Sequence, residues 1–269
     1  MQMPTTYTHD AFGRETYQKL PEEIKDRIRP YKKLYLIGLH GPDIFFYYKP
    51  YIFKGNELVD FGHAMHKEKA RIFFEEGIKT CRGTNSGALM AYLMGFVCHY
   101  ILDSTCHPFV DEYEHASGLS HTEIETELDR FFMERDGKNP FAYHPACAIV
   151  ADDASADVIS MAFPVFSEKQ IRKALEGMKL YCNITVTDQE RKRKMFHRIL
   201  KLVGADDYMG KRIIEKEKNP KSAASTRELV RLYERALDEI VPAVTNFYRA
   251  VMEGETLSER FDQDYCNYS

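Results

Sequence analysis

The stretch from Ser86 to Leu102 constrains the fold most strongly, because it contains no Asp, Glu, Lys or Arg. A helix that spans a membrane needs about 20 predominantly apolar residues. This stretch is shorter, contains His99 and is followed directly by Asp103. We therefore expect a buried central helix around which the rest of the chain packs, and no transmembrane segment.

Helical patterns continue along most of the chain, and no useful length of sequence alternates between apolar and polar residues as a half-buried strand does. No Gly/Ser linker, break in composition or internal repeat divides the sequence. We therefore expect residues 1–269 to form one all-α, multi-helix domain. Besides the central helix and one beginning at His121, the predicted helices cover residues 12–20, 21–31, 67–79, 151–162, 168–181, 188–202 and 225–252.

Two segments around the central helix are predicted to be irregular. Residues 34–53 are apolar and aromatic but are interrupted by glycine and proline, which favours a structured loop. Residues 104–119 are expected to form an irregular bridge. The next helix has a clear start signal, since Ser120 and Glu123 form a capping-box pattern directly around His121.

Composition excludes several classes of function. Lys and Arg total 37 against 41 Asp and Glu, giving a formal charge of −4, so no long nucleic acid is expected as a partner. The charge also gives no reason to bind an anionic membrane surface. Six cysteines are scattered without a C-x-x-C pair, as in proteins with reduced, mostly buried thiols. The sequence as given shows no secretory signal, and we expect a cytoplasmic location.

The central helix carries a histidine and an acid on one face. His99 and Asp103 stand four residues apart, so both side chains leave the helix on the same side. Burying an ionised carboxylate costs several kcal/mol unless a cation or hydrogen bonds compensate it. A bound metal ion would supply the compensating positive charge and bind the carboxylate oxygens directly.

The same spacing recurs in the helix that follows. His121 and Glu125 are again four residues apart, and His107 lies between the two pairs. A single pair of this kind is usually a surface hydrogen bond. Two pairs, one of them in an uncharged helix, favour a metal site, and a mixed set of nitrogen and oxygen ligands suits zinc.

The segments HYILDSTCH and HTEIE resemble the H-x3-D, H and H-x3-E arrangement of the zinc-dependent phospholipase C family. That family shares its all-α fold with fungal single-strand nucleases. The upstream segments THDAFG, with His9, and GPDIFFYY, with Asp43, are similar to it too, and GHAMH supplies a further histidine. The resemblance runs in motif order from about His9 to Glu125.

The resemblance implies two or three zinc ions. His63 and His66 both compete for the role of the GHAMH histidine, and we favour His66 because it directly precedes a predicted amphipathic helix. Secreted members of the family complete the third position with an N-terminal Trp, and this chain contains no Trp. The implied ligands are Asp43, His99, Asp103 and one GHAMH histidine for the first ion, His107, His121 and Glu125 for the second, and His9 with a bridging Asp103 for the third.

The chemistry that the resemblance implies is hydrolysis of a phosphodiester, in a phospholipid head group or a related small molecule. Asp43 is the expected general base; otherwise it is a turn-forming residue after Pro42. Phe45, Phe46 and Tyr47 would line the mouth of a substrate pocket, or else pack in the core. A nuclease or nucleotidase of the same fold and a non-catalytic metal-binding helical domain are the alternatives.

Overall fold

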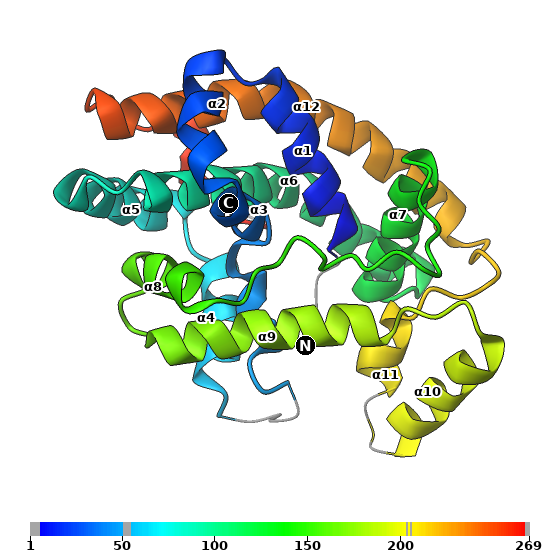
Figure 1. Cartoon of the computed structure of the whole chain (residues 1–269). Coiled ribbons are helices and arrows are strands. Elements are labelled where there is room, and N and C mark those ends of the chain that lie inside the picture. Colours follow the sequence, from blue (N-terminus) through cyan, green and yellow to red (C-terminus); the bar gives the residue numbers. More distant parts are fainter. Residues whose placement is uncertain (1–5, 51–54, 203, 205, 267–269) are drawn as a thin grey trace.

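The computed structural model describes residues 6–50, 55–202, 204 and 206–266 (Figure 1). Regular structure within these residues is entirely helical, which confirms the predicted all-α class. The α-helices are α1 (Tyr7–Lys19), α2 (Glu22–Ile28), α3 (Lys32–Gly38), α4 (Glu57–His66), α5 (Ala70–Thr84), α6 (Gly87–Ser117), α7 (His121–Arg135), α8 (Asp153–Ala162), α9 (Glu168–Ile184), α10 (Glu190–Leu202), α11 (Asp206–Met209) and α12 (Ser222–Met252). The 3-10 helices are η1 (Arg29–Tyr31), η2 (Gly41–Tyr47), η3 (Gly210–Arg212) and η4 (Glu259–Asp262).

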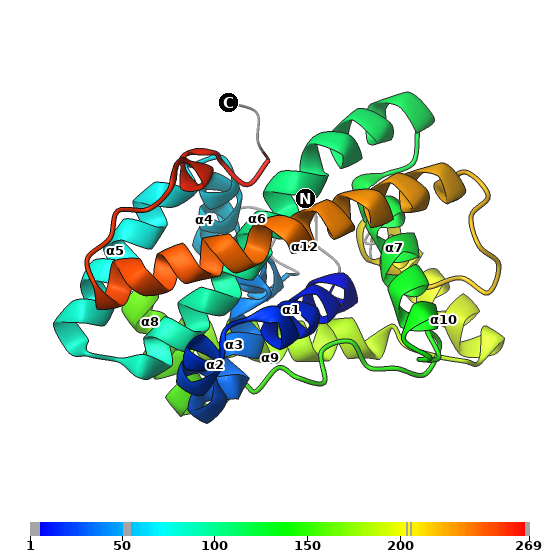
Figure 2. The same cartoon turned by 90° about the horizontal axis from the view of Figure 1, so that it is seen from above.

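Helix α6 runs through the middle of the molecule and packs against both α12 and α3 (Figures 1 and 2). Ser86 caps its start, because the Ser86 hydroxyl accepts a hydrogen bond from the backbone N–H of Leu89. Among the described residues, α6 is long and apolar enough to cross a membrane. However, 94% of its most apolar 18-residue stretch is buried inside the protein, as expected for a central core helix.

The prediction of an irregular bridge over residues 104–119 is wrong, because α6 continues to Ser117. An interior proline costs a helix about 3 kcal/mol, and Pro108 lies inside α6. Packing of this part of the helix on the rest of the protein outweighs that cost, as the buried side chains of His107 and Val110 on either side of the proline show. The helix ends at Gly118, which has a left-handed φ of 71°.

The predicted loop over residues 34–53 is also wrong in part, since α3 and η2 lie within it; residues 51–54 are outside the described part. The glycines there serve close packing of helices. A β-carbon added to Gly38 would lie 2.1 Å from the carbonyl oxygen of Tyr92 in α6. A β-carbon added to Gly95 of α6 would lie equally close to the carbonyl oxygen of Tyr35 in α3. The two helix backbones therefore meet directly, which fixes η2 beside α6.

Other predicted helices agree with the structure to within a few residues, and the differences in the N-terminal half concern α1, α4 and α5. Helix α1 begins at Tyr7, five residues earlier than predicted, because a distant carboxylate caps it, as described below. Helix α4 was not predicted, and α5 begins at Ala70 where 67 was expected. The capping box of Ser120 and Glu123 at the start of α7 is confirmed.

Buried apolar side chains form one cluster that reaches from Tyr7 in α1 to Tyr265 near the end of the described chain. All six cysteines are free thiols; four are buried, Cys147 is exposed and Cys266 is intermediate. The expectation of mostly buried thiols is thus confirmed.

Candidate metal centre

Three elements bring Asp43, His66, His99 and Asp103 together. Asp43 lies in η2, His66 is the last residue of α4, and the other two lie one turn apart in α6. The Nε2 atom of His66 is 3.2 Å from Oδ1 of Asp43, and Nε2 of His99 is 3.0 Å from Oδ2 of Asp103. The Nδ1 atom of His99 lies 3.8 Å from Oδ2 of Asp43. Four residues expected to share the first ion thus meet in one place.

The turn that carries Asp43 is pressed against the His99 ring. Gly41 has a left-handed φ of 47°, and an added β-carbon would lie 2.1 Å from Cδ2 of His99. Glycine adopts such a φ at little cost and leaves room for the imidazole. Asp43 follows two residues later and faces the same ring. The glycine of the Gly-Pro-Asp sequence therefore lets the turn approach the His99 ring, so that the Asp43 carboxylate lies beside that ring. A bulkier residue at position 41 would clash with the ring and keep the turn away from it.

A second group lies at the junction of α6 and α7. The Nε2 atom of His121 is 3.0 Å from Oε1 of Glu125, and Nε2 of His107 is 3.7 Å from the same oxygen. His107 also faces the first group, with Nε2 3.8 Å from Oδ2 of Asp103. The second predicted ligand set is therefore assembled beside the first.

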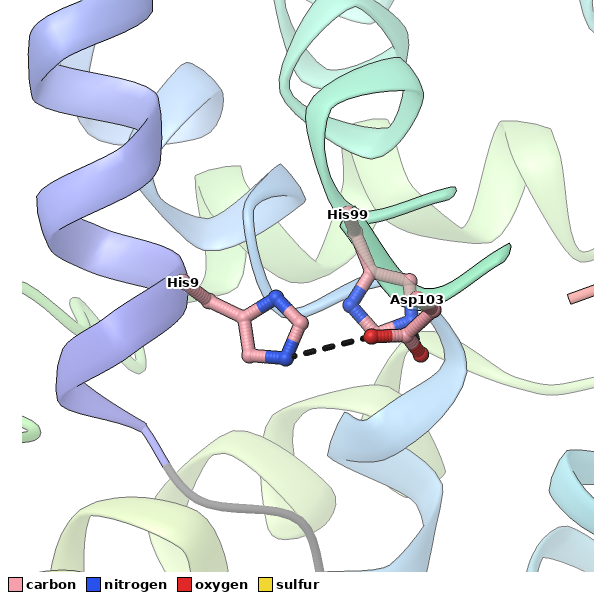
Figure 3. Close-up of side chains that lie close together, drawn as sticks. All are labelled: His9, His99 and Asp103. Carbon is pink, nitrogen blue, oxygen red and sulfur yellow. Dashed lines mark ion pairs between the residues drawn. The ribbon is translucent and has the colours of Figure 1, made fainter. Parts of the chain in front are cut away.

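The third group joins α1 to α6. Figure 3 shows His9 reaching from α1 towards Asp103, with its Nε2 atom 3.4 Å from Oδ1 of that carboxylate. The ring of His9 stacks on that of His99, with centroids 4.7 Å apart. Since Oδ1 of Asp103 faces His9 and Oδ2 faces His99, the carboxylate lies between the two groups, as the bridging role requires.

Several buried oxygen and nitrogen atoms in these groups, all of them able to bind a metal ion, have no hydrogen-bond partner among the residues that the structure describes. They are both carboxylate oxygens of Asp43, Oε2 of Glu125, Nδ1 of His9 and both ring nitrogens of His99. Burying a carboxylate without donors costs several kcal/mol, so native structures rarely leave one in that state. A divalent cation would satisfy these atoms. The residues present therefore fit a metal centre with nitrogen and oxygen ligands, a set that zinc accepts.

Charges within the groups hold the carboxylates ionised. Burial alone would raise the pKa of Asp103, but the charges of His99 and His107 lower it well below its usual value. Burial also opposes ionisation of Glu125, yet the charge of His121 lowers its pKa. The pKa of His107 is raised well above normal because Asp103 outweighs the effect of burial. Ionised carboxylates next to these rings suit a divalent cation, which would take the place of the ring protons.

Of the two candidate histidines in GHAMH, the structure brings only His66 to the acids. Its Nδ1 atom lies 2.7 Å from the carbonyl oxygen of Gly62, which can only accept, so Nδ1 donates and Nε2 faces Asp43 with its lone pair. His63 packs its ring on Phe46, with centroids 4.7 Å apart. Within the described chain, His63 belongs to none of the groups with metal-ligand spacing.

The aromatic residues after Asp43 do not line a pocket mouth, and that expectation needs correction. Phe45 and Tyr47 are fully buried, and Phe46 is 3% exposed. Phe45 packs edge-on against Phe163, and the Tyr47 hydroxyl accepts a hydrogen bond from the Cys182 thiol. These side chains are core residues that support η2 from behind.

Sequence reasoning missed residues that contact the predicted ligands. Asp111 lies next to His121, with Oδ1 3.3 Å from Nδ1. Its spacing of four from His107 would have identified it if residues 104–119 had been recognised as helical. Near the C-terminus, the backbone N–H of Tyr265 donates to the carbonyl of His66 at 3.2 Å. No local pattern in the sequence links those two positions.

Comparison with known protein families matches residues 8–175 to zinc-dependent phospholipase C. No curated protein and no solved structure matches the chain. The matched range includes every residue of the three groups, and it exceeds half of the 269 residues. The protein belongs to the zinc-dependent phospholipase C family.

Proposed function

We propose that this protein is a zinc-dependent phosphoesterase that hydrolyses phosphodiester bonds, with a phospholipid head group or a related small phosphodiester as its substrate. One observation carries the proposal: two groups of potential ligands share Asp103 and His99, and a third lies beside them with His107 facing Asp103, inside a chain that belongs to the family. Groups that share a carboxylate suit two or more ions held close together. That arrangement is typical of enzymes that act on phosphate esters.

We assign the ligands as the geometry of the three groups suggests. Closely spaced divalent ions supply positive charge to phosphoryl oxygens and lower the pKa of water. The first ion would be held by Asp43, His66, His99 and Asp103, the second by His107, His121 and Glu125, and a third by His9 with Asp103.

Asp43 is the general base in this proposal. It is 1% exposed and lies between the rings of His66 and His99, with no hydrogen-bond donor to either oxygen among the described residues. With one Asp43 oxygen on the first ion, the other would be free to accept the proton of the attacking water. The water oxygen bonds to phosphorus, the bond from phosphorus to the leaving oxygen breaks, and Asp43 accepts the proton of the water.

A small substrate is favoured over a nucleic acid by the charge of the chain. The net charge is −4, and the one strongly basic run, residues 191–194, lies in the peripheral helix α10 (Figure 1). Arg193 in that run is itself buried and donates to the carbonyl of Thr187. The run therefore offers fewer free cations to a phosphate backbone than its sequence suggests.

Turnover of a chromogenic phosphocholine ester tests the proposal, with a chromogenic nucleotide ester for comparison. We expect zinc-dependent hydrolysis of the choline ester, reduced about 100-fold or more in Asp43→Asn. Asp60→Asn, which changes an exposed carboxylate in α4, is the matched control and should keep full activity.

Three results would count against the proposal. Preferred hydrolysis of the nucleotide ester would indicate a nucleotidase. Stoichiometric zinc binding without turnover of either ester would indicate a non-catalytic metal-binding domain. Full activity of Asp43→Asn would refute the assignment of the base.

A further inference from the structure

The last turns of α6 hold the first residue of α7 at two points. The Oδ1 atom of Asp111 lies 3.3 Å from Nδ1 of His121, and the backbone N–H of His121 donates to Oε1 of Glu114 at 3.0 Å. Both acids lie beyond His107 on the part of α6 that extends past Pro108. The ring and the backbone of His121 are therefore each fixed by a carboxylate from α6.

The two nitrogens of His121 face different acids. The Nε2 atom points to Glu125, 3.0 Å away, within the group that includes His107, while Nδ1 points to Asp111. A neutral imidazole that offers the Nε2 lone pair to a cation must carry its proton on Nδ1. A carboxylate at Nδ1 accepts that proton in a hydrogen bond, fixes the tautomer and orients the ring.

We propose that Asp111 is a positioning residue for the metal centre, which fixes the tautomer and the direction of His121, with Glu114 holding the backbone at the same residue. This inference rests on the proposed metal centre. It gives the C-terminal turns of α6 a role that goes beyond carrying His107. The geometry of those turns makes the second ligand group depend on residues that do not themselves touch the ion.

Asp111, Glu114 and His121 are also close enough to one another to hold an ion themselves. That reading would need the lone pair of Nδ1, whereas a zinc ion shared with His107 and Glu125 needs the lone pair of Nε2 and a proton on Nδ1. Glu114 already accepts the backbone N–H of His121 through Oε1. The orientation of Nε2 towards the buried Glu125 favours the positioning role.

The experiment measures zinc binding to purified full-length protein by competition with a chelator, for wild type, Asp111→Ala and Asp111→Asn. We expect Asp111→Ala to weaken one zinc ion by 10- to 100-fold without lowering the number bound at saturation. Asp111→Asn should recover part of the loss, since its amide oxygen still accepts from Nδ1. Glu112→Ala, which removes an exposed acid from the neighbouring position of the same helix, is the control and should bind zinc as wild type does.

Two further readouts separate positioning from general stabilisation. In chelator, Asp111→Ala and Glu112→Ala should unfold at similar denaturant concentrations. The ¹⁵N spectrum of the zinc-loaded protein should show His121 protonated at Nδ1 in wild type. Unchanged zinc affinity in Asp111→Ala, or a loss of stability without a loss of affinity, overturns the inference.

The outcomes also distinguish this inference from the proposed function. A wild-type protein that binds no zinc overturns both. A saturating zinc count that falls by one in Asp111→Ala, with the other ions held as before, shows that Asp111 is a ligand and overturns the positioning role alone.

Discussion

A β-carbon on Gly41 would lie 2.1 Å from the Cδ2 atom of His99, so the first turn of η2 packs directly against the His99 imidazole of α6. This contact brings the carboxylate of Asp43 to the candidate metal centre. It also explains why a glycine with a φ of 47° precedes the Pro-Asp pair.

Gly41→Ala should displace either the turn or the His99 ring. We expect at least a tenfold loss of zinc affinity together with lower stability, because the strained φ alone costs about 1 kcal/mol. Gly137→Ala is the matched control, since Gly137 has a φ of 67° but no atom within 4 Å of an added β-carbon. Equal zinc affinity in the two variants, measured by chelator competition, would mean that the contact with His99 does not position the ligands.

His66→Ala and His63→Ala should differ although the two residues lie one turn apart on α4. Only His66 faces Asp43 and Asp103, at 3.2 and 3.9 Å from Nε2. We expect His66→Ala to lose one zinc ion and His63→Ala to keep all of them, as measured by metal analysis after dialysis. Loss of zinc from His63→Ala alone would reverse the assignment.

Asp129 anchors the start of α1 from across the molecule. Its carboxylate accepts hydrogen bonds from the backbone N–H groups of Thr6, Tyr7 and Thr8, and from the Thr8 hydroxyl. It thereby caps the helix that carries His9. No side chain from α1 itself supplies this cap.

Asp129→Asn should lower the free energy of unfolding by about 1–3 kcal/mol, because an amide cannot accept at both positions and leaves buried donors unpaired. It should also weaken the zinc ion nearest His9. Glu134→Gln, at an exposed position of the same helix, should cost less than about 1 kcal/mol in denaturant titrations. A cost for Asp129→Asn as small as that of the control would contradict the capping role.

Zinc affinity should keep rising with pH above about 6.5, the pH at which an ordinary histidine is half deprotonated. Burial alone would lower the pKa of His121, but the charge of Glu125 and hydrogen bonds raise it to about 9 in the metal-free protein. Because the protonated ring cannot bind zinc, affinity should increase by up to tenfold per pH unit for each proton released, up to about pH 9. Chelator competition between pH 6.5 and 9 measures this, and a plateau above pH 7 would contradict it.

The metal-free protein should show the opposite trend in stability. A histidine whose pKa is raised on folding stabilises the protein fully below its unfolded value of about 6.5, and the stabilisation is lost as the pH rises through the folded value. The contribution of His121 in chelator should therefore decline between about pH 6.5 and 9.

Much of the candidate centre was predictable because its members lie on helices at short spacing. His99 with Asp103 and His121 with Glu125 obey the i, i+4 rule, so each pair could be placed on one helical face before any tertiary contact was known. The buried central helix was predictable from the absence of charge in residues 86–102.

The misplaced segments share one cause, which is that tertiary packing outweighed a local breaker. Residues 104–119 were expected to be irregular, whereas α6 continues through Pro108 to Ser117, and this error concealed Asp111. Gly38 was interpreted as loop punctuation, whereas it permits contact between the backbones of α3 and α6. Neither outcome is encoded within the few residues around the breaker.

Long-range contacts were beyond sequence reasoning altogether. Asp129 and Thr8, which form part of the cap, are 121 residues apart in the sequence. Because of this cap, α1 begins at Tyr7, where residue 12 was predicted, and the helix therefore includes His9. The burial of Phe45 and Tyr47 was equally undetermined, since an aromatic run next to an acid has the same sequence in a core and at a pocket mouth.

A zinc-edge anomalous difference map from crystals of the zinc-loaded protein tests the metal centre most directly. At least two peaks should appear, one in contact with His66 and one with His121, and a third peak at His9 would establish the third ion. A single peak, no peak, or a peak held by His63 would contradict the account. The ligands expected around the first two peaks are Asp43, His66, His99 and Asp103, and His107, His121 and Glu125.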